Sequence, residues 1–376
     1  MGLKIGIVTE YYYPLLGGVT ENVCNTKKTL QRAGHEVKVI TSNCGDVRSD
    51  GSRYHDPPSP DVVRIGRSLP VYSNGSLARV TVGRNLKARI ARVLEEEEFD
   101  LLHCHSPIVP MLPLLALAAA RCPVVGTFHT YFDRSLAYAI LKDAAQRRLD
   151  RLDGQIAVSQ SCIDALSRYF RLRARIIPNG VDTDQFNPSV PRLEKFDDGK
   201  LNLLFVSRFD PRNGLALMLR AFRIVKSAFP DVRLIVVGDG MLRFYYKQLV
   251  PKELARDVHF EGLIRDRRPS YYAACDVFCS PVMKASFGVT LLEAMAAGKP
   301  IVATENTGYK ELLSPQEGFL VPQRDPKAFA ETILRLLRDE RLRRDMGANG
   351  RRKALRYSWD IVGSQIRAYY AEILGG

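Results

Sequence analysis

The pattern of apolar positions along the chain repeats one arrangement twice. Short apolar runs, rich in β-branched residues, alternate with longer segments in which apolar residues recur every three or four positions. The first pattern is typical of buried strands and the second of amphipathic helices. Strands that are apolar throughout are expected in a parallel sheet covered by helices on both faces, so the chain is predicted to be an α/β protein.

The first half is predicted to hold seven strands with helices between several of them. Helices are expected at Glu21–Ala33 and Val82–Glu97, and the apolar run Ile108–Ala120 is expected to be a buried helix. The strands are expected at Lys4–Thr9, Glu36–Thr41, Val62–Ile65, Leu101–His105, Val124–Phe128, Gln155–Val158 and Ala174–Ile177.

The pattern breaks at Pro178-Asn179-Gly180, a turn signal, and then at the polar stretch Asn187–Lys200. It restarts with six further strands and ends in a helix expected at Ile361–Leu374. We therefore predict two doubly wound Rossmann-like domains that face a central cleft. The predicted boundaries are residues 1–185 for the first domain, 186–200 for a linker, 201–358 for the second domain, and 359–376 for a helix that crosses back to the first.

The elements of the second half are predicted in the same way. Strands are expected at Leu201–Ser207, Arg233–Gly238, Val258–Glu261, Val277–Ser280, Ile301–Thr304 and Phe319–Val321. Helices are expected at Leu215–Ala228, Met241–Leu249, Tyr271–Ala274, Leu291–Ala297 and Pro326–Arg338.

The composition is that of a globular protein with an excess of positive charge. The 376 residues are 46% hydrophobic and carry a formal net charge of +14. This charge favours an anionic partner, either a phosphorylated ligand, a membrane surface or nucleic acid, although solubility alone also explains it. Aromatic residues are not interleaved with the basic ones, so nucleic acid is not expected. Seven cysteines, an odd number, favour a reduced compartment, and we expect a cytoplasmic protein.

Three candidate polar groups follow predicted strands. Gly17 and Gly18 precede a helix and allow backbone amides to approach an anion. His129 follows the strand Val124–Phe128 and is expected to point toward the cleft, unless it is only a buried structural histidine. Arg208 ends the first strand of the second domain and can hold phosphate oxygens, unless it only pairs with Asp210.

Two further segments have competing interpretations. Asp182-Thr183-Asp184 matches a metal-binding DxD pattern, but a turn that leads into the linker is the preferred interpretation. The helix around residues 83–97 carries basic residues on one side and apolar residues at helical spacing. It is predicted either to contact an anionic membrane or to be an ordinary solvated helix. Its basic residues are Arg84, Lys87, Arg89 and Arg92.

The chain resembles the retaining GT-B glycosyltransferases of the nucleotide-sugar family. The residues that carry the resemblance run through most of the chain, and the stretch Ser286–Thr304 (SFGVTLLEAMAAGKPIVAT) is the most specific. The others are Gly17-Gly18, His129, Ile177–Asp182, Arg208 and Gly238-Asp239-Gly240. The stretch Asn74–Arg79, the basic helix after it and the GTFHT segment resemble the phosphatidyl-myo-inositol mannosyltransferase family.

The resemblance implies a role for each matching residue. His129 is expected to contact the transferred sugar, and Arg208 to neutralise the leaving nucleoside diphosphate. Glu293 is expected to hold the ribose hydroxyls. The remaining implied donor contacts are Gly17, Gly18, Arg212, Asn213, Gly238, Leu263, Phe287 and Gly288, and the implied acceptor contacts are Tyr11, Asn74, Ser76 and Arg79.

The resemblance also implies the reaction and the partners. A hexosyl group of the mannose or glucose type is expected to pass from a nucleotide-diphosphate sugar to a membrane lipid or polyol, with retention. No metal or other cofactor is expected. GDP-mannose follows from the nearest resemblance, while UDP-sugars remain open. The protein is expected to lie peripherally on the inner face of the membrane.

Two positions depart from the family pattern. Asn213 stands where the family usually has lysine, and Ala285 stands where it usually has the first of two glutamates eight positions apart. These departures leave a second hypothesis, a GT-B scaffold that binds ligands without transferring a sugar. A third hypothesis, a basic nucleic-acid binder, rests on the charge alone.

Overall fold

The computed structural model describes residues 2–45, 47–49, 52–54, 59–73, 76–109, 111–264 and 266–375. The chain divides into two compact units. Unit 1 comprises Met1–Arg48, Ser52–Asn179 and Trp359–Gly376, and unit 2 comprises Ser49–Gly51 and Gly180–Ser358. The division therefore lies between Asn179 and Gly180, and the stretch predicted to be a linker, residues 186–200, belongs to unit 2.

Unit 1 is built on an eight-stranded sheet in the order β10-β9-β8-β7-β1-β2-β5-β6. All neighbouring strands are parallel except β5 and β6, which form an antiparallel hairpin. The strands are β1 Lys4–Val8, β2 Glu36–Asn43, β5 Val62–Ser73, β6 Ser76–Val82, β7 Leu101–His105, β8 Val124–Phe128, β9 Gly154–Ala157 and β10 Arg175–Ile176. A separate two-stranded sheet pairs β3 Val47–Ser49 with β4 Ser52–Tyr54.

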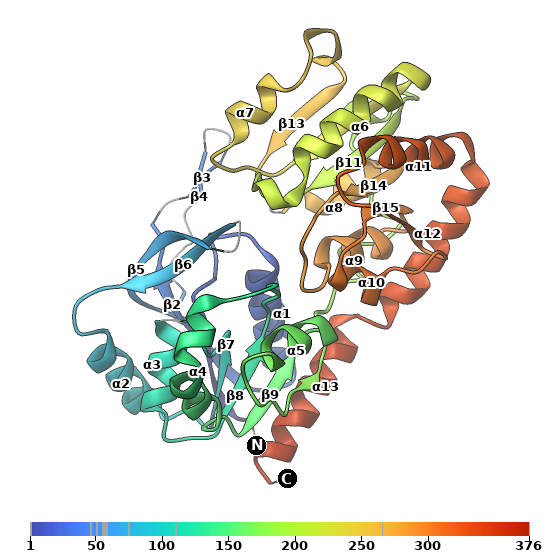
Figure 1. Cartoon of the computed structure of the whole chain (residues 1–376). Helices are drawn as coiled ribbons and strands as arrows, with labels where there is room; N and C mark the ends of the chain where they lie inside the picture. Colours follow the sequence, from blue (N-terminus) through green and yellow to red (C-terminus); the bar gives the residue numbers. More distant parts are fainter. Residues whose placement is uncertain are drawn as a thin grey trace. The chain divides into compact units, whose positions relative to one another are not determined.

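Helices cover both faces of this sheet (Figure 1). On one face the core contains residues of α1 and α13, and on the other face residues of α2, α3, α4 and α5. The helices are α1 Gly18–Arg32, α2 Leu86–Glu97, α3 Leu112–Ala119, α4 Leu136–Leu149, α5 Gln160–Ser167 and α13 Trp359–Ile373.

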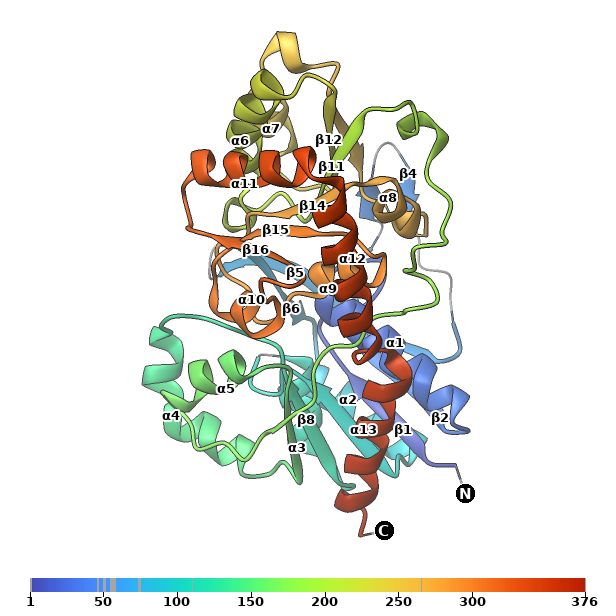
Figure 2. The ribbon, with the colours of Figure 1, turned by 90° about the vertical axis from the view of Figure 1, so that its right-hand side faces the viewer.

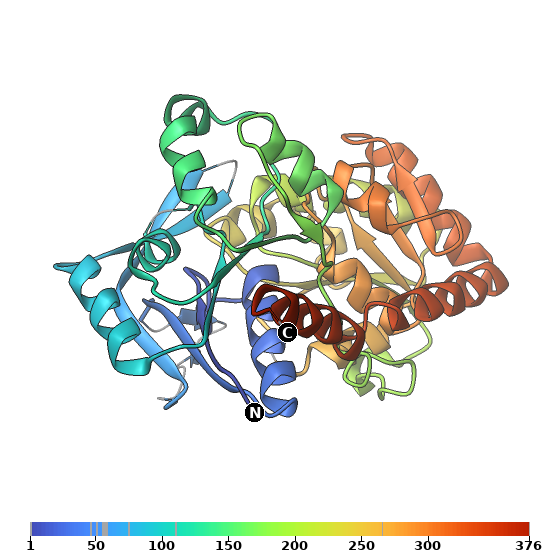
Figure 3. The same cartoon turned by 90° about the horizontal axis from the view of Figure 1, so that it is seen from below.

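The last helix of the chain, α13, packs beside α1 (Figures 2 and 3). A Cβ on Gly363 of α13 would lie 2.1 Å from a methyl carbon of Thr29 on α1, so the two helices approach too closely for a larger residue. The hydroxyl of Tyr369 accepts the amide hydrogen of Gln155 on β9 at 2.9 Å. The closing helix therefore belongs to the core of unit 1.

Unit 2 holds a fully parallel six-stranded sheet in the order β13-β12-β11-β14-β15-β16. The strands are β11 Leu201–Val206, β12 Val232–Val237, β13 Val258–Gly262, β14 Val277–Ser280, β15 Ile301–Thr304 and β16 Gly318–Val321. The helices are α6 Leu215–Ala228, α7 Arg243–Gln248, α8 Arg268–Ala274, α9 Val289–Ala296, α10 Thr307–Leu312, α11 Pro326–Arg338 and α12 Glu340–Leu355, with short 3₁₀ turns η1 Glu194–Phe196, η2 Pro211–Asn213 and η3 Lys252–Leu254.

The predicted element pattern differs from the structure at a few places. The strand predicted at Val62–Ile65 is the first part of a long strand, β5, and Val82 ends β6 instead of beginning a helix. The strand β5 extends to Ser73 because β6 pairs with it as an antiparallel hairpin. The paired residues do not form an apolar run, so the sequence pattern did not indicate the longer strand. Helices α4, α5, α10 and α12 were not predicted.

Aspartates fix the amino ends of both sheets. Asp100, directly before β7, accepts the amide hydrogen of Lys4, the first residue of β1, at 2.7 Å. Asp153, directly before β9, accepts that of Val124 in the same way. Each carboxylate thus pairs an edge amide that the ladder leaves unsatisfied and holds two neighbouring strands in register.

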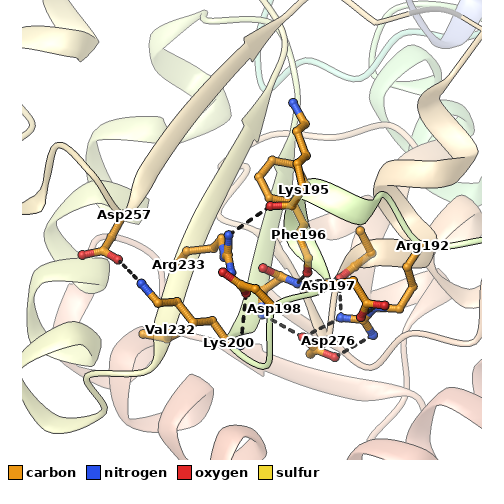
Figure 4. Close-up of polar contacts among 12 residues, drawn as sticks. Arg192, Lys195, Phe196, Asp197, Asp198, Lys200, Val232, Arg233, Asp257 and Asp276 are labelled. Atoms are coloured by element: carbon orange, nitrogen blue, oxygen red, sulfur yellow. Dashed lines mark hydrogen bonds and ion pairs between the residues drawn. The ribbon is translucent and has the colours of Figure 1, made fainter.

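In unit 2 the aspartates before the strands belong to a larger network of polar contacts (Figure 4). Asp276, directly before β14, accepts hydrogen bonds from the backbone amide of Asn202 at 2.7 Å and from the guanidinium of Arg192 at 3.2 Å. Asp257, before β13, pairs with Lys226 at 2.9 Å. Arg233 reaches Asp198. The segment around residues 192–200 is therefore bound to the amino edge of the sheet, which explains why it packs with unit 2.

We expect Asp276→Ala to destabilise unit 2 by about 1–3 kcal/mol, because a buried amide and a guanidinium lose a charged acceptor. Urea unfolding followed by fluorescence measures the change. The matched control is Asp345→Ala on α12, whose pairing with Arg341 is exposed and is expected to contribute less than about 1 kcal/mol. Equal midpoints for the two variants would contradict the assignment.

Candidate functional site

The carboxyl ends of the central strands gather the candidate polar groups of each unit. In unit 1, β1 lies between β7 and β2, and in unit 2, β11 lies between β12 and β14. At these positions the chain reverses its direction of travel across the sheet, and connections leave toward opposite faces. Such switch points are where open parallel sheets bind ligands, and the predicted site residues can be located around them.

The amino end of α1 follows β1 in unit 1. Gly17 and Gly18 are both exposed, and a Cβ on Gly17 would meet no atom within 4 Å. The N-cap residue is Gly17, which has no side chain with which to cap the helix. The positive end of a 15-residue helix therefore faces open space, which is suitable for an anion such as a diphosphate.

His129 directly follows β8 and belongs to a group of three histidines. His103 and His105 come from β7, the neighbouring strand, and Nδ1 of His105 lies 2.8 Å from Nε2 of His129. His103 bonds through Nε2 to Thr127 at 2.6 Å and through Nδ1 to the hydroxyl of Tyr370 at 2.7 Å. His129 also lines a small pocket with Ser106, Val109, Tyr138 and Leu166.

Burial keeps all three imidazoles neutral. Loss of hydration lowers the pKa of His103 and of His129 to about 3 each. Burial likewise lowers the pKa of His105 well below its ordinary value, and the neighbouring histidines lower it further. At neutral pH each ring therefore carries one N–H and one lone pair, so His129 can donate or accept a hydrogen bond but does not supply charge.

The structure brings together two of the four predicted acceptor residues. The hydroxyl of Tyr11, after β1, accepts the amide hydrogen of Arg79 on β6 at 3.0 Å. Ser76 is the first residue of β6, and only its backbone is described. Asn74 lies outside the described residues.

In unit 2 the loop after β11 holds Arg208 and its neighbours. The guanidinium of Arg208 pairs with Asp210 at 3.2 Å, and its side chain is 42% exposed, so it remains accessible to a ligand. The side-chain amide of Asn213 donates to the carbonyl of Arg208 at 2.8 Å. The uncharged residue at the family's lysine position therefore braces the loop that carries Arg208.

This loop is in contact with the loop that follows β14. The carbonyl of Arg212 accepts the amide hydrogen of Met283 at 2.9 Å. Gly214 has a φ of 77°, and a Cβ there would lie 2.0 Å from the carbonyl oxygen of Pro281, so only glycine fits. The loop that carries Arg208, Arg212 and Asn213 is thereby held against the start of the loop after β14, which leads to Ala285.

The other predicted donor residues lie around the same sheet edge. Gly238 directly follows β12, has a φ of 137° and donates its amide hydrogen to the carbonyl of Gly262, the residue before Leu263. Phe287 is buried, and Gly288 is the N-cap of α9. A Cβ on Gly308 of α10 would lie 2.8 Å from the amide nitrogen of Phe287, so this helix packs tightly under the loop.

Glu293 is buried on α9, and both of its oxygens have partners. Oε1 pairs with Arg268 at 2.8 Å, and Oε2 accepts the hydroxyl hydrogen of Tyr272 at 2.7 Å. The sequence did not point to Arg268 or Tyr272, because their proximity to Glu293 depends on how α8 packs against α9.

Two of the remaining predictions concern Asp182 and the basic helix. The carboxylate of Asp182 accepts amide hydrogens of Asp184 and Gln185, the geometry of a local turn. On α2, Leu86 and Ile90 face the core, and the basic residues Lys87, Arg89 and Arg92 are exposed, as is Arg84 just before the helix. Arg92 pairs with Glu96 one turn away.

Comparisons with known proteins identify the family. Residues 16–185 match the model described as Glycosyltransferase Family 4, and residues 189–353 match that described as Glycosyl transferases group 1. The chain is 33% identical over 383 residues to the phosphatidyl-myo-inositol mannosyltransferase of Mycolicibacterium smegmatis, with 99% of this chain and 95% of that protein covered. The chain belongs to the GT-B glycosyltransferases.

Other relatives and solved structures agree with this family. The glycosyltransferase is 28% identical to the alpha-monoglucosyldiacylglycerol synthase of Streptococcus pneumoniae, with 83% of this chain and 73% of that protein covered. A sucrose-phosphate synthase from Thermosynechococcus elongatus shares its fold, with a TM-score of 0.75, 21% identity and 99% of each chain covered. Anabaena HepE in complex with UDP and glucose also shares it, with a TM-score of 0.75, 22% identity and 98% and 99% coverage.

Sequence reasoning missed the two histidines of β7 in this glycosyltransferase. His103 and His105 alternate along a strand, so their side chains lie on the same face, and β7 pairs with the strand that ends before His129. Two polar residues at alternate positions of an otherwise apolar strand were the available signal. Glu10 was also missed: its buried carboxylate accepts the amide hydrogens of Met111 and Leu112 at 2.7 Å each.

We expect the stability of unit 1 to fall as the pH drops from 7 to 5. The folded-state pKa of each buried histidine lies below the unfolded value near 6.5, so their stabilisation is present above that value and is lost as the pH falls toward 3. The loss between pH 7 and pH 5 is about 2 kcal/mol for each of His103 and His129. Urea unfolding of wild type and His129→Asn at both pH values measures it, and the variant should lose less stability on acidification. The same loss in both proteins would contradict the assignment.

Proposed function

We propose that this glycosyltransferase moves a hexosyl group of the mannose or glucose type from a nucleotide-diphosphate sugar to a membrane lipid or polyol. The observation that carries the proposal is the loop pair of unit 2, in which the loop that carries Arg208 contacts the loop after β14 through Arg212 and Gly214. The names of the relatives support the transferred group and the lipid acceptor, because one is a mannosyltransferase and another a monoglucosyldiacylglycerol synthase.

In this proposal Arg208 stabilises the negative charge of the leaving nucleoside diphosphate. When the bond to the sugar breaks, negative charge develops on the nucleoside diphosphate, and a positioned cation stabilises that charge more than the ground state. Asp210 already pairs with Arg208 and is positioned to orient its guanidinium. We propose that Arg208 and backbone amides meet the diphosphate charge, without a metal ion.

The proposal includes retention of configuration. Two buried carboxylates already have partners. Glu10 accepts hydrogen bonds from Thr81 and from amides at the start of α3. Glu293 on α9 pairs with Arg268 and accepts a hydrogen bond from Tyr272. These contacts support structural or ribose-binding roles instead of nucleophilic attack. We propose an oxocarbenium-like transition state in which the acceptor attacks from the face that the diphosphate leaves, and His129 contacts the transferred sugar.

We expect Arg208→Ala to lower kcat by roughly 100- to 1,000-fold, because the developing charge loses its cation. The assay combines purified protein, GDP-mannose or a UDP-sugar, and a total membrane lipid extract, with mass spectrometry of the nucleoside diphosphate and of new glycolipid. The matched control is Arg223→Ala on an exposed position of α6, which should leave turnover unchanged.

Unchanged turnover in Arg208→Ala would defeat the active-site assignment. If wild type binds nucleotide but forms no product with any lipid or soluble polyol acceptor, the binding scaffold suggested by Asn213 and Ala285 replaces the transferase as the explanation.

We further propose that the enzyme meets its lipid acceptor at an anionic membrane surface. Among the described residues, no helix is long and apolar enough to cross a bilayer. On α2 the basic side chains face outward while the apolar ones are used in the core. Helix α4 has the exposed apolar side chains that α2 lacks. Leu136 and Ile140, one turn apart, are 77% and 71% exposed. Arg147 follows Ile140 two turns later on the same side of the helix.

We expect Leu136→Asp/Ile140→Asp to reduce binding to vesicles that contain phosphatidylglycerol by at least roughly tenfold, because each apolar side chain contributes about 1.5–3 kcal/mol when fully buried. Vesicle flotation measures the bound fraction. The matched control is Leu355→Asp, which alters an apolar side chain of α12 that is 44% exposed. Equal loss in the control, or none in the α4 variant, would exclude α4 as the contact.

A further inference from the structure

The contact between His105 and His129 is an edge-to-edge hydrogen bond. The nitrogens are 2.8 Å apart, whereas the ring centroids are 5.1 Å apart and the ring planes differ by only 13°. Two rings that nearly share a plane and approach through one nitrogen each are aligned along the N–H direction. The bond arises from the fold, because His105 ends β7 and His129 follows β8, which pairs with it.

The neighbouring histidine, His103, does not compete for this bond. Both of its ring nitrogens already have partners, Thr127 and the hydroxyl of Tyr370. His105 uses Nδ1 for His129, and its Nε2 is buried with no hydrogen-bond partner in the part of the chain that the structure describes. The proton of His105 must therefore reside either on the bonded nitrogen or on the unpartnered one.

The unpartnered nitrogen decides the direction of the bond. If Nε2 of His105 carried the proton, a buried N–H would have no acceptor, and such donors are rarer in proteins than unfilled acceptor lone pairs. If Nδ1 carries the proton, it is donated to His129 and only a lone pair is left over. The second arrangement requires Nε2 of His129 to be the acceptor, so the single proton of a neutral His129 is on its Nδ1.

We propose that His105 is a positioning residue, which donates its Nδ1–H to Nε2 of His129 and thereby holds His129 as the Nδ1–H tautomer. The inference rests on the proposed function in that His129 then offers an N–H to an oxygen of the transferred sugar. The fixed tautomer makes His129 a hydrogen-bond donor at Nδ1. A ring held in this form donates a hydrogen bond at Nδ1 and does not take a proton from the acceptor hydroxyl at that atom.

The direct test is the tautomer of His129 in the full-length protein without substrate. Long-range ¹H–¹⁵N correlation spectra of histidine-labelled protein distinguish the two neutral forms, and the spectrum of His129→Asn identifies the signals of His129 among six histidines. The expected result is an Nδ1–H ring. An Nε2–H ring for His129 in wild type would overturn the proposal.

Variants of His105 test its consequence for catalysis. His105→Leu removes the donor, so the His129 ring should lose the pure Nδ1–H signature and kcat should fall roughly 10- to 100-fold, with little change in KM for the nucleotide sugar. His105→Asn places an amide N–H near the former Nδ1 and should restore most of both. The matched control Tyr370→Phe removes a bond of the same buried group without touching His105 or His129, and should leave the tautomer unchanged.

The two kinds of failure are separable. Because the tautomer is read without donor or acceptor, an inactive wild type with an Nδ1–H ring would count against the proposed function and still support the role of His105. A folded His105→Leu protein with unchanged tautomer and kcat would overturn that role, even if the enzyme is active. Loss of kcat that His105→Asn does not relieve, with the tautomer unchanged, would likewise overturn it.

Discussion

Parallel strand pairing is the constraint on which the rest of this molecule depends. Parallel neighbours start at one edge of a sheet and finish at the other, so residues that follow different strands in the sequence arrive at a common edge. His105 and His129 are 24 positions apart and yet share a hydrogen bond because β7 and β8 pair in parallel. In unit 2 the same rule brings the loops after β11 and β14 together.

The two edges of each sheet have different chemistry. At the amino edges, carboxylates directly before strands take up backbone amides, as Asp100, Asp153 and Asp276 show. At the carboxyl edges lie glycines, neutral histidines and Arg208, whose side chain is 42% exposed. At the amino edges these backbone amides are hydrogen-bonded within the protein, and the bonds contribute to its stability. The carboxyl edges supply groups suited to anionic or hydroxylated ligands, and in unit 1 these include a helix end whose N-cap residue is Gly17.

The structure shows what surrounds Asn213 and Ala285, the two positions that depart from the family pattern. Asn213 does not replace a cation, but its amide fixes the carbonyl of Arg208 and so contributes to the position of the remaining charge. Ala285 lies in a loop that α10 supports from below, where Gly308 permits a close approach. Both changed positions therefore lie in loops that are held by contacts within unit 2.

The sequence by itself determined the alternation of strands and helices, the two α/β units, and the segments that belong to the strand ends. Apolar runs and turn residues encode these features locally, which is why α6 and α11 begin and end where the pattern predicted. It did not determine the hairpin of β5 and β6, the side to which residues 186–200 belong, or the partners of Glu293. The histidine bond, the Tyr370 contact and the exposed face of α4 were likewise decided only by tertiary structure. Each depends on which distant segments pack together, and local hydrophobic periodicity carries no information about that choice.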